Sequence, residues 1–308
     1  MRLRDALELL LLAALFGASF LYMRIAAPEF GAYPLAAARV ALAALVLLPV
    51  VIVRHESRQL IRNGKALVMA GLFNSAVPFA CFSYAATVLP VGVSSLLNAT
   101  TPLWGAIVAW VWLHDRPLPT RAAGLAIGFT GALVLFWTPL PASSPGNLHL
   151  AALAALAAPL SYGIAASFTQ RYLSHTSALV NSAGSLIGAS LLLAVPAWLN
   201  WPTQPISWQS WLSVILLAVL STAFAYILLF RLIGRIGPVR AVTVTYLVPL
   251  FGITWGALLL GEPVTSQMVL AGAIILLGTA LATGMLPRRR RPLSTSDASR
   301  PDRPADGD

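Results

Sequence analysis

The chain has 308 residues, of which 58% are hydrophobic and 10% are charged. A soluble globular domain carries about 25% charged residues, so this composition excludes a water-exposed globular surface and favours a chain that lies in a lipid bilayer. The net charge of +10 does not indicate a nucleic-acid partner. The arginines fall in short segments between apolar stretches and leave no basic face that could bind phosphates.

Ten apolar stretches follow one another along the chain, each long enough to form a helix that crosses the bilayer. A crossing requires about 20 mainly apolar residues. No segment alternates polar and apolar residues over its length, which excludes a transmembrane β-barrel. Prolines between the stretches, such as Pro28, Pro34 and Pro90, are expected to end helices. We therefore predict an all-α polytopic membrane protein with helices at residues 6–27, 33–53, 66–88, 91–113, 120–138, 148–170, 178–199, 210–230, 241–260 and 265–286.

Lysine and arginine lie almost entirely in alternate connectors. The connectors that follow residues 53 and 113, for example, are basic, whereas no lysine or arginine occurs in 28–33, 88–91, 139–147, 200–209 or 261–265. Basic connectors of membrane proteins face the cytoplasm. We therefore expect a multi-pass protein of the cell inner membrane with cytoplasmic N- and C-termini.

The second half of the chain repeats the first at a constant offset. A shift of 147 residues superimposes rare residues of both halves: Arg24 on Arg171, Pro49 on Pro196, Pro102 on Pro249, Gly105 on Gly252, Asp115 on Glu262 and Gly131 on Gly278. Each copy has an odd number of predicted helices, so the second copy enters the membrane from the opposite side. Inverted repeats of this kind surround a central site in many transporters.

The repeat defines the expected domain organisation. A first five-helix repeat covers residues 1–138, a linker covers 139–147 and a second five-helix repeat covers 148–286. Residues 287–308 are rich in Arg, Pro, Ser and Asp, which predicts a disordered basic and polar cytoplasmic tail.

The ends of the two copies share a motif. Pro102 and Pro249 each begin an apolar helical segment that ends in an acidic residue, Asp115 or Glu262. This pattern resembles the EamA-type repeat of the drug/metabolite transporter superfamily, and within it the aromatic amino-acid exporter branch. The resemblance implies a ten-helix fold with a central cavity between the first, third and fourth helices of each copy, and export of amino acids or related metabolites. The chain departs from the usual pattern at His114, where glycine is commoner.

Signatures of enzymes, metals and cofactors are missing from the sequence. Gly64-Lys65 lacks both the first glycine and the Ser or Thr of a nucleotide-binding loop. The four histidines never have a metal-binding spacing. No Asp, Glu or His lies near the middle of a predicted span, which disfavours a carboxylate proton relay and favours facilitated diffusion. We expect no catalytic activity, no cofactor and no metal.

Polar and aromatic residues inside the predicted helices are the candidates for a cavity wall. A polar group that faces lipid costs free energy, so such groups are expected to face protein or a water-filled path, although Ser and Thr can also bond to their own helix. Three prolines within helices, Pro78, Pro102 and Pro249, are candidate hinges, and packing kinks explain them equally well. The predicted lining comprises Tyr22, Asn74, Phe79, Asn98, Thr101, Trp104, Tyr162, Tyr226, Thr245 and Tyr246.

Arg39 is the one deep cation, about 9 Å into its predicted span by helical rise. An arginine at a helix centre costs about 2.5–3.5 kcal/mol on insertion scales. It can extend to the interface with help from Glu29 or from aromatic neighbours, or it can bind a substrate carboxylate.

These expectations define a secondary-type exporter of amino acids, aromatic or apolar, or of related small metabolites, which works by alternating access. An aromatic and neutral lining suits such zwitterions and organic cations. The alternatives are a multidrug or sugar-metabolite transporter of the same fold, and an integral membrane enzyme that modifies lipids. The expected partners are a small-molecule substrate and the bilayer. A monomer suffices for transport, and the sequence does not fix the oligomeric state.

Overall fold

The computed structural model describes residues 3–136, 147–241 and 243–284, and every regular element in these ranges is a helix. Seven helical segments are long and apolar enough to cross a membrane: Leu3–Phe30, Ala32–Val53, Gly64–Val88, Val91–Leu113, Leu148–Tyr172, Ala178–Leu199 and Trp208–Ile236. Three shorter apolar helices occupy Pro119–Leu135, Val244–Leu260 and Ser266–Ala282. The prediction of a polytopic helical membrane protein is confirmed. The predicted tail and most of the predicted linker lie outside the described residues.

Two long segments of the first half are divided into shorter helices. The segment that ends at Val88 contains a π-helix, and the one that ends at Leu113 is interrupted after Asn98. The elements up to residue 136 are α1 (Leu3–Phe30), α2 (Ala32–Val53), α3 (Ser57–Arg62), α4 (Gly64–Gly71), η1 (Leu72–Ala76), α5 (Val77–Val88), α6 (Val91–Asn98), α7 (Thr101–Leu113) and α8 (Pro119–Phe136).

The second half has a similar order of elements, including a second π-helix. They are α9 (Leu148–Tyr172), α10 (Ala178–Leu199), α11 (Trp208–Ala218), η2 (Val219–Phe224), α12 (Ala225–Ile236), α13 (Pro238–Ala241), α14 (Val244–Leu260) and α15 (Ser266–Ala282).

The expectation that prolines end the first helix was wrong. Pro28 lies inside α1, which continues to Phe30. The chain turns instead at Gly31, whose φ of +74° is a conformation that favours glycine. Pro34 lies in the first turn of α2, where the missing N–H costs no helical hydrogen bond.

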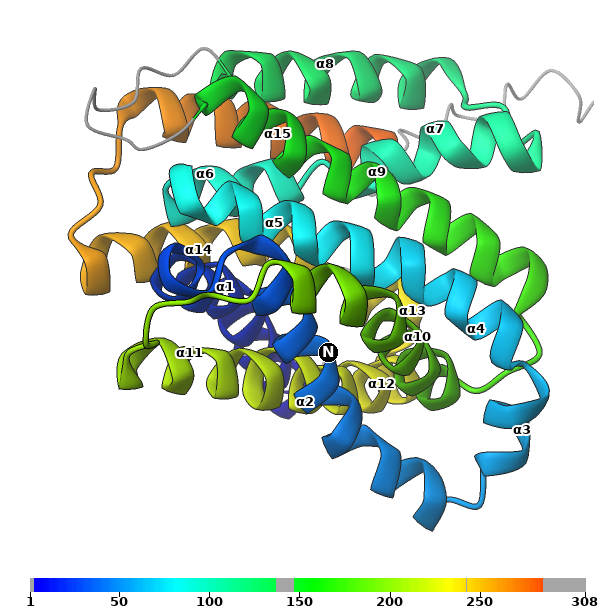
Figure 1. Ribbon diagram of the computed structural model, residues 1–308. Coiled ribbons are helices and arrows are strands. Elements are labelled where there is room, and N and C mark those ends of the chain that lie inside the picture. The colour runs from blue at the N-terminus through cyan, green and yellow to red at the C-terminus, as the bar shows by residue number, and fades with distance from the viewer. Residues whose placement is uncertain (1–2, 137–146, 242, 285–308) are drawn as a thin grey trace, which may run out of the picture.

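The packing pairs helices from different halves of the chain (Figure 1). Helix α8 packs along α15, α2 along α10, α1 along α14, and α7 along α9. Glycines allow close approach at three of these crossings, those of α8 with α15, α1 with α14 and α7 with α9. A Cβ atom at Gly17 of α1 would lie 2.9 Å from the backbone nitrogen of Gly252, and one at Gly163 of α9 would lie 3.0 Å from that of Gly105. These contacts bring both halves of the chain into one bundle.

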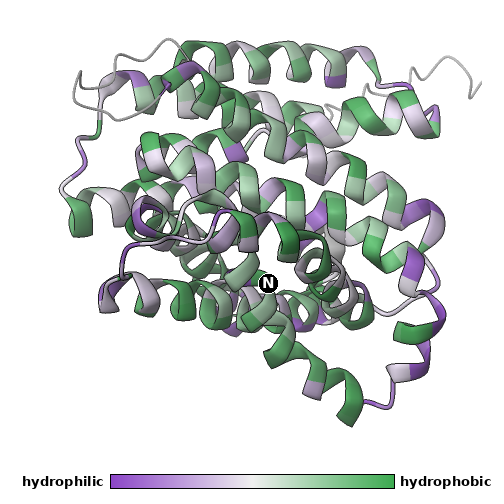
Figure 2. Ribbon diagram, in the orientation of Figure 1, coloured by the Kyte–Doolittle hydropathy of each residue, from purple (hydrophilic) through white to green (hydrophobic). Residues whose placement is uncertain are grey.

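The helices of this bundle are mostly apolar along their length, and hydrophilic residues gather near their ends and in the connectors (Figure 2). Large hydrophobic side chains such as Leu45, Val111 and Leu258 are exposed, as lipid-facing side chains require. Helix α3 and the connector between α7 and α8 lie at one end, and the connector between α14 and α15 lies at the opposite end (Figure 1). The predicted basic and non-basic connectors thus separate along the bundle.

Candidate functional site in the centre of the bundle

The two π-helices lie at positions related by the 147-residue offset. Element η1 begins at Leu72 and η2 at Val219. Only the first is followed by a proline, Pro78, so proline is not the common cause of the π-turn. Single π-turns within α-helices occur frequently at functional sites. Each one is followed by an aromatic residue, Phe79 or Tyr226, which faces the cavity described next.

A cavity of about 200 Å³ lies between elements of both halves. Three pairs of its lining residues are related by the same offset: Phe79 with Tyr226, Asn98 with Thr245, and Thr101 with Val248. The cavity is therefore built from equivalent positions of the two copies, with neutral polar groups at the break between α6 and α7 and at the start of α14. The complete lining is Phe16, Ser19, Phe20, Met23, Arg39, Phe79, Phe82, Asn98, Thr101, Tyr162, Tyr226, Thr245 and Val248.

Arg39 of α2 is the charged residue of this cavity. Its side chain is buried, and it does not extend to the interface beside Glu29. Glu29 instead accepts hydrogen bonds from the backbone and hydroxyl of Ser207. The Arg39 Nε donates to the Thr222 hydroxyl oxygen at 3.0 Å, and its Cζ lies 3.6 Å from the ring centroid of Phe79. The interfacial alternative for Arg39 was therefore wrong.

Four residues of the predicted lining lie outside the cavity wall. Tyr22 packs against the main hydrophobic core, and Asn74 is hydrogen-bonded to Tyr226. Trp104 stacks edge-on against Phe129, with ring centroids 4.9 Å apart. The Tyr246 hydroxyl bonds to the Thr283 hydroxyl at 2.8 Å, which ties α14 to α15.

The candidate hinges have three different settings. Pro78 and Pro102 each occupy the second position of a helix that follows an interruption, whereas Pro249 lies inside α14. Bending at these positions remains a prediction.

Helix α1 contributes three apolar residues to the cavity that were not among the predicted lining residues. Phe16, Phe20 and Met23 face the cavity together with Ser19. The spacing i, i+3, i+4, i+7 places these residues on one helical face, and that periodicity is the signal that could have identified them. Their apolar character made them indistinguishable from residues that face lipid.

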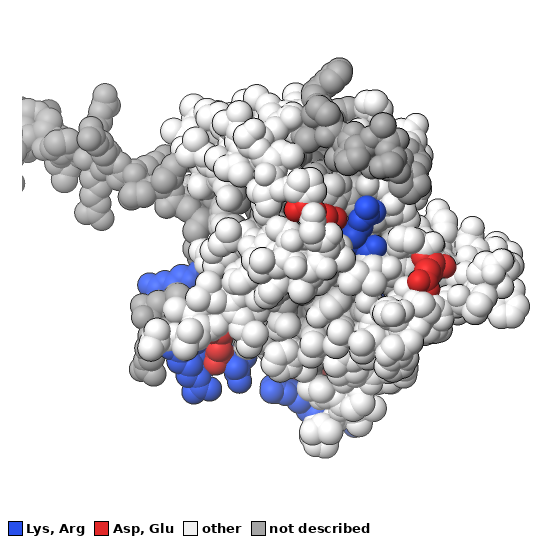
Figure 3. Space-filling model, turned by 90° about the vertical axis from the view of Figure 1, so that its left-hand side faces the viewer, with Lys and Arg blue, Asp and Glu red and all other residues white. Residues whose placement is uncertain are grey.

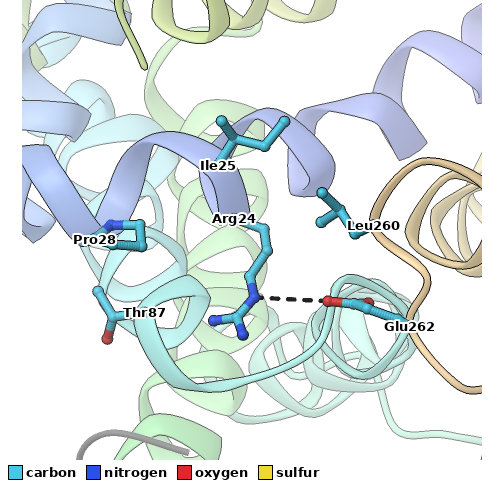
Figure 4. A pocket seen from close by; sticks show the side chains of 6 residues that line it. All are labelled: Arg24, Ile25, Pro28, Thr87, Leu260 and Glu262. Carbon is cyan, nitrogen blue, oxygen red and sulfur yellow. Dashed lines mark ion pairs between the residues drawn. The ribbon is translucent and has the colours of Figure 1, made fainter. Parts of the chain in front are cut away.

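A second cavity, of about 590 Å³, lies near the connector between α14 and α15. Glu262 of this connector and Arg24 of α1 point toward each other across it, with Oε1 and Nε 3.6 Å apart (Figure 4). In the space-filling view of this end, which is largely uncharged, an acidic and a basic surface lie side by side in a hollow (Figure 3). Arg24 also donates to the backbone oxygen of Ala86 at 2.8 Å.

Glu262 connects the turn after α14 to the start of α6. It does not cap the following helix, where Thr265 accepts from the Met268 N–H. Its Oε2 accepts from the Val91 N–H at 2.8 Å, at the start of α6. Burial raises the pKa of the Glu262 carboxyl above its ordinary value, and the Val91 N–H and the Arg24 charge oppose this shift only in part.

The described part of the chain contains no group of three or more His, Cys, Asp or Glu side chains placed to hold a metal ion. A helical membrane bundle with an internal cavity built from both halves is an architecture typical of transporters.

Comparison with known proteins gives the family. The model of the EamA-like transporter family matches residues 6–137 and again residues 149–284. The chain therefore belongs to the EamA-like transporter family and is a membrane transporter.

Individual relatives agree with this assignment. A probable amino-acid metabolite efflux pump of Salmonella typhimurium is 30% identical over 61% of this chain and 66% of its own length. A probable terminal-alkyne amino-acid exporter of Streptantibioticus cattleyicolor is 23% identical over 96% of this chain and 99% of its own. A solved crystal structure with 19% identity covers 92% of this chain and 98% of that chain with a TM-score of 0.64, which shows a shared fold.

Proposed function

We propose that this protein exports amino acids, with aromatic or apolar side chains, or related small metabolites across the inner membrane. The names of the efflux pump and the exporter above support the class of substrate. The transport is secondary, and it requires neither a cofactor nor another subunit. The N- and C-termini are cytoplasmic in this proposal, because the basic connectors then face the cytoplasm.

The proposed mechanism is alternating access between two inverted five-helix repeats, residues 1–138 and 148–286. The proposal assigns its ten spans to the seven long segments and, in addition, to the three shorter apolar helices. The observation that carries the proposal is the cavity lining. Because positions related by 147 residues face the same space, an exchange of conformation between the repeats changes the end from which that space is reached.

Counterflow in liposomes tests the proposal. Purified protein is reconstituted, and uptake of labelled phenylalanine, tryptophan and methionine is measured with and without a proton gradient. We expect saturable uptake that is insensitive to the gradient. Uptake that depends on the gradient would contradict facilitated diffusion, and uptake of drugs or sugars alone would contradict the substrate class.

Two matched variants test whether the substrate passes through this cavity. Thr101 lines the cavity and Thr130 is exposed on α8, and the hydroxyl of each donates to a backbone carbonyl three or four residues earlier. Thr101→Trp is expected to block uptake by filling the cavity, and Thr130→Trp is expected to leave it unchanged. Equal uptake by the two variants would place the path elsewhere.

A further inference from the structure

Arg39 is a buried cation with no acidic partner in the described part of the chain. Its residue is 6% exposed, and none of the ion pairs among the described residues includes it. Removal of a charge from water without a counter-ion costs several kcal/mol. A guanidinium that faces a cavity under these conditions favours an anion from outside the chain.

The protein offers Arg39 few acceptors. The guanidinium has five N–H donors in a planar fork. The acceptors are the Thr222 hydroxyl oxygen and, at 3.6 Å from Nη1, the sulfur of Met23. A thioether is a weak acceptor. The fork geometry matches the two oxygens of a carboxylate, and the Phe79 ring beneath the guanidinium fixes its plane.

Comparison of the two repeats shows that this charge is present in one half of the chain only. The position related to Arg39 by 147 residues is Leu186, which is fully buried and has no polar side-chain atom. At the equivalent positions Phe79 and Tyr226, in contrast, both repeats have an aromatic ring. The cavity therefore has one cationic end, which suits a ligand with a single carboxylate.

No aspartate or glutamate of the described ranges lines the cavity. An ammonium group of the ligand has only neutral oxygens and aromatic faces to contact, and it is repelled by Arg39. The amino group of an amino acid therefore adds little to its binding.

We propose that Arg39 binds the substrate carboxylate and that the transporter selects small monocarboxylates with an apolar body, whether or not they carry a free amino group. This inference rests on the proposed function and narrows its substrate class. Desamino and N-acylated analogues of apolar amino acids are then ligands, and the corresponding amines are not.

Binding and counterflow test the inference separately. Thermal unfolding of the detergent-purified protein is followed with phenylalanine, 3-phenylpropanoate, N-acetylphenylalanine or phenethylamine, and the same compounds compete with labelled phenylalanine in counterflow. We expect the three acids to raise the unfolding temperature and to compete, and phenethylamine to do neither. Stabilisation by phenethylamine equal to that by 3-phenylpropanoate would overturn the inference.

Arg39→Leu copies the residue of the second half and removes the buried charge, while the Thr222 hydroxyl keeps its hydrogen bond to the Leu217 carbonyl. We expect it to weaken binding of the acids about tenfold or more, as loss of a charged hydrogen bond does. Leu186→Met, on the helix that packs along α2, serves as the control and is expected to leave this binding unchanged. Retention of acid binding within about threefold would overturn the inference. If the acids stabilise the protein but no solute is transported, the proposed function fails and the carboxylate site stands.

Discussion

The two corners that follow α7 and α14, at His114–Asp115 and Gly261–Glu262, share one backbone geometry but differ in their contacts. His114 and Gly261 both adopt the left-handed conformation, with φ of 60° and 66°. The next N–H, of Asp115 or Glu262, returns to the carbonyl six residues earlier at 3.3 or 3.1 Å. Glu262 is then held by α1 and α6, whereas Asp115 is exposed and, among the described residues, makes no ion pair.

The reason for this difference lies in the partners. The residue equivalent to Val91, whose N–H binds Glu262, is Pro238, which has no N–H to donate. The equivalent of Arg24 is Arg171, which lies over the ring of Tyr172 with its Cζ 5.6 Å from the centroid. Both repeats thus have the same turn, but only the turn after α14 is bonded to neighbouring helices. The two turns would therefore resist the proposed exchange of conformations to different extents.

The largest expected effect comes from removing the two carboxylates in turn. Glu262→Ala leaves the Val91 N–H without its acceptor, which we expect to lower the free energy of unfolding by about 1–3 kcal/mol. Asp115→Ala removes an exposed side chain and is expected to change it by less than about 0.5 kcal/mol. Thermal unfolding in detergent, followed by tryptophan fluorescence, measures both. Equal losses would mean that the two corners do not differ in strength.

The donor can be removed without changing the acceptor. Val91→Pro copies Pro238, and the first position of a helix tolerates proline because its N–H has no intrahelical partner. We expect a loss of about 1 kcal/mol from the missing hydrogen bond. The double variant with Glu262→Ala should lose no more than Glu262→Ala alone. Additive losses would show that the 2.8 Å bond is not the shared cause.

Sequence alone predicted the elements of these corners better than their contacts. The apolar stretches predicted the ends of α7 and α14, at residues 113 and 260, and the repeat placed Asp115 and Glu262 at equivalent positions. The partner of Glu262 was not predictable, because Val91 is 171 residues away and contributes a backbone atom that no side-chain pattern reveals. The same holds for Arg39, whose depth was visible in the sequence but whose hydrogen bond to Thr222 depends on tertiary packing.

A smaller effect is expected from exchanging the left-handed residues. A non-glycine residue in this conformation costs roughly 1 kcal/mol, so His114→Gly should stabilise the protein by about 0.5–1 kcal/mol. Gly261→Ala should destabilise it by a similar amount, and an added Cβ meets nothing within 4 Å there, so the effect is that of the backbone alone. The same unfolding measurement applies. A loss of stability in His114→Gly would show that the imidazole holds the corner by a contact of its own.

The smallest effect concerns the charge of Glu262, as distinct from its hydrogen bond. Because burial raises its pKa above the ordinary 4.5, the folded state binds the proton more tightly than the unfolded state. The contribution of Glu262 to stability is therefore full below the unfolded pKa and decreases as the pH rises through the folded pKa.

Glu262→Gln keeps an acceptor for Val91 and removes the titration. We expect it to be at least as stable as the native protein at neutral pH, to lose less than Glu262→Ala, and to lack the decline with rising pH that starts near 4.5. The ion pair lost with the charge is worth less than about 1 kcal/mol, because the Arg24 side chain remains 28% exposed. Thermal unfolding of the native protein, Glu262→Gln and Glu262→Ala between pH 4 and 8 measures these differences. If Glu262→Gln were as unstable as Glu262→Ala, the attraction to Arg24 would be what fastens this corner, and the missing N–H of Pro238 would no longer explain why the other corner is open.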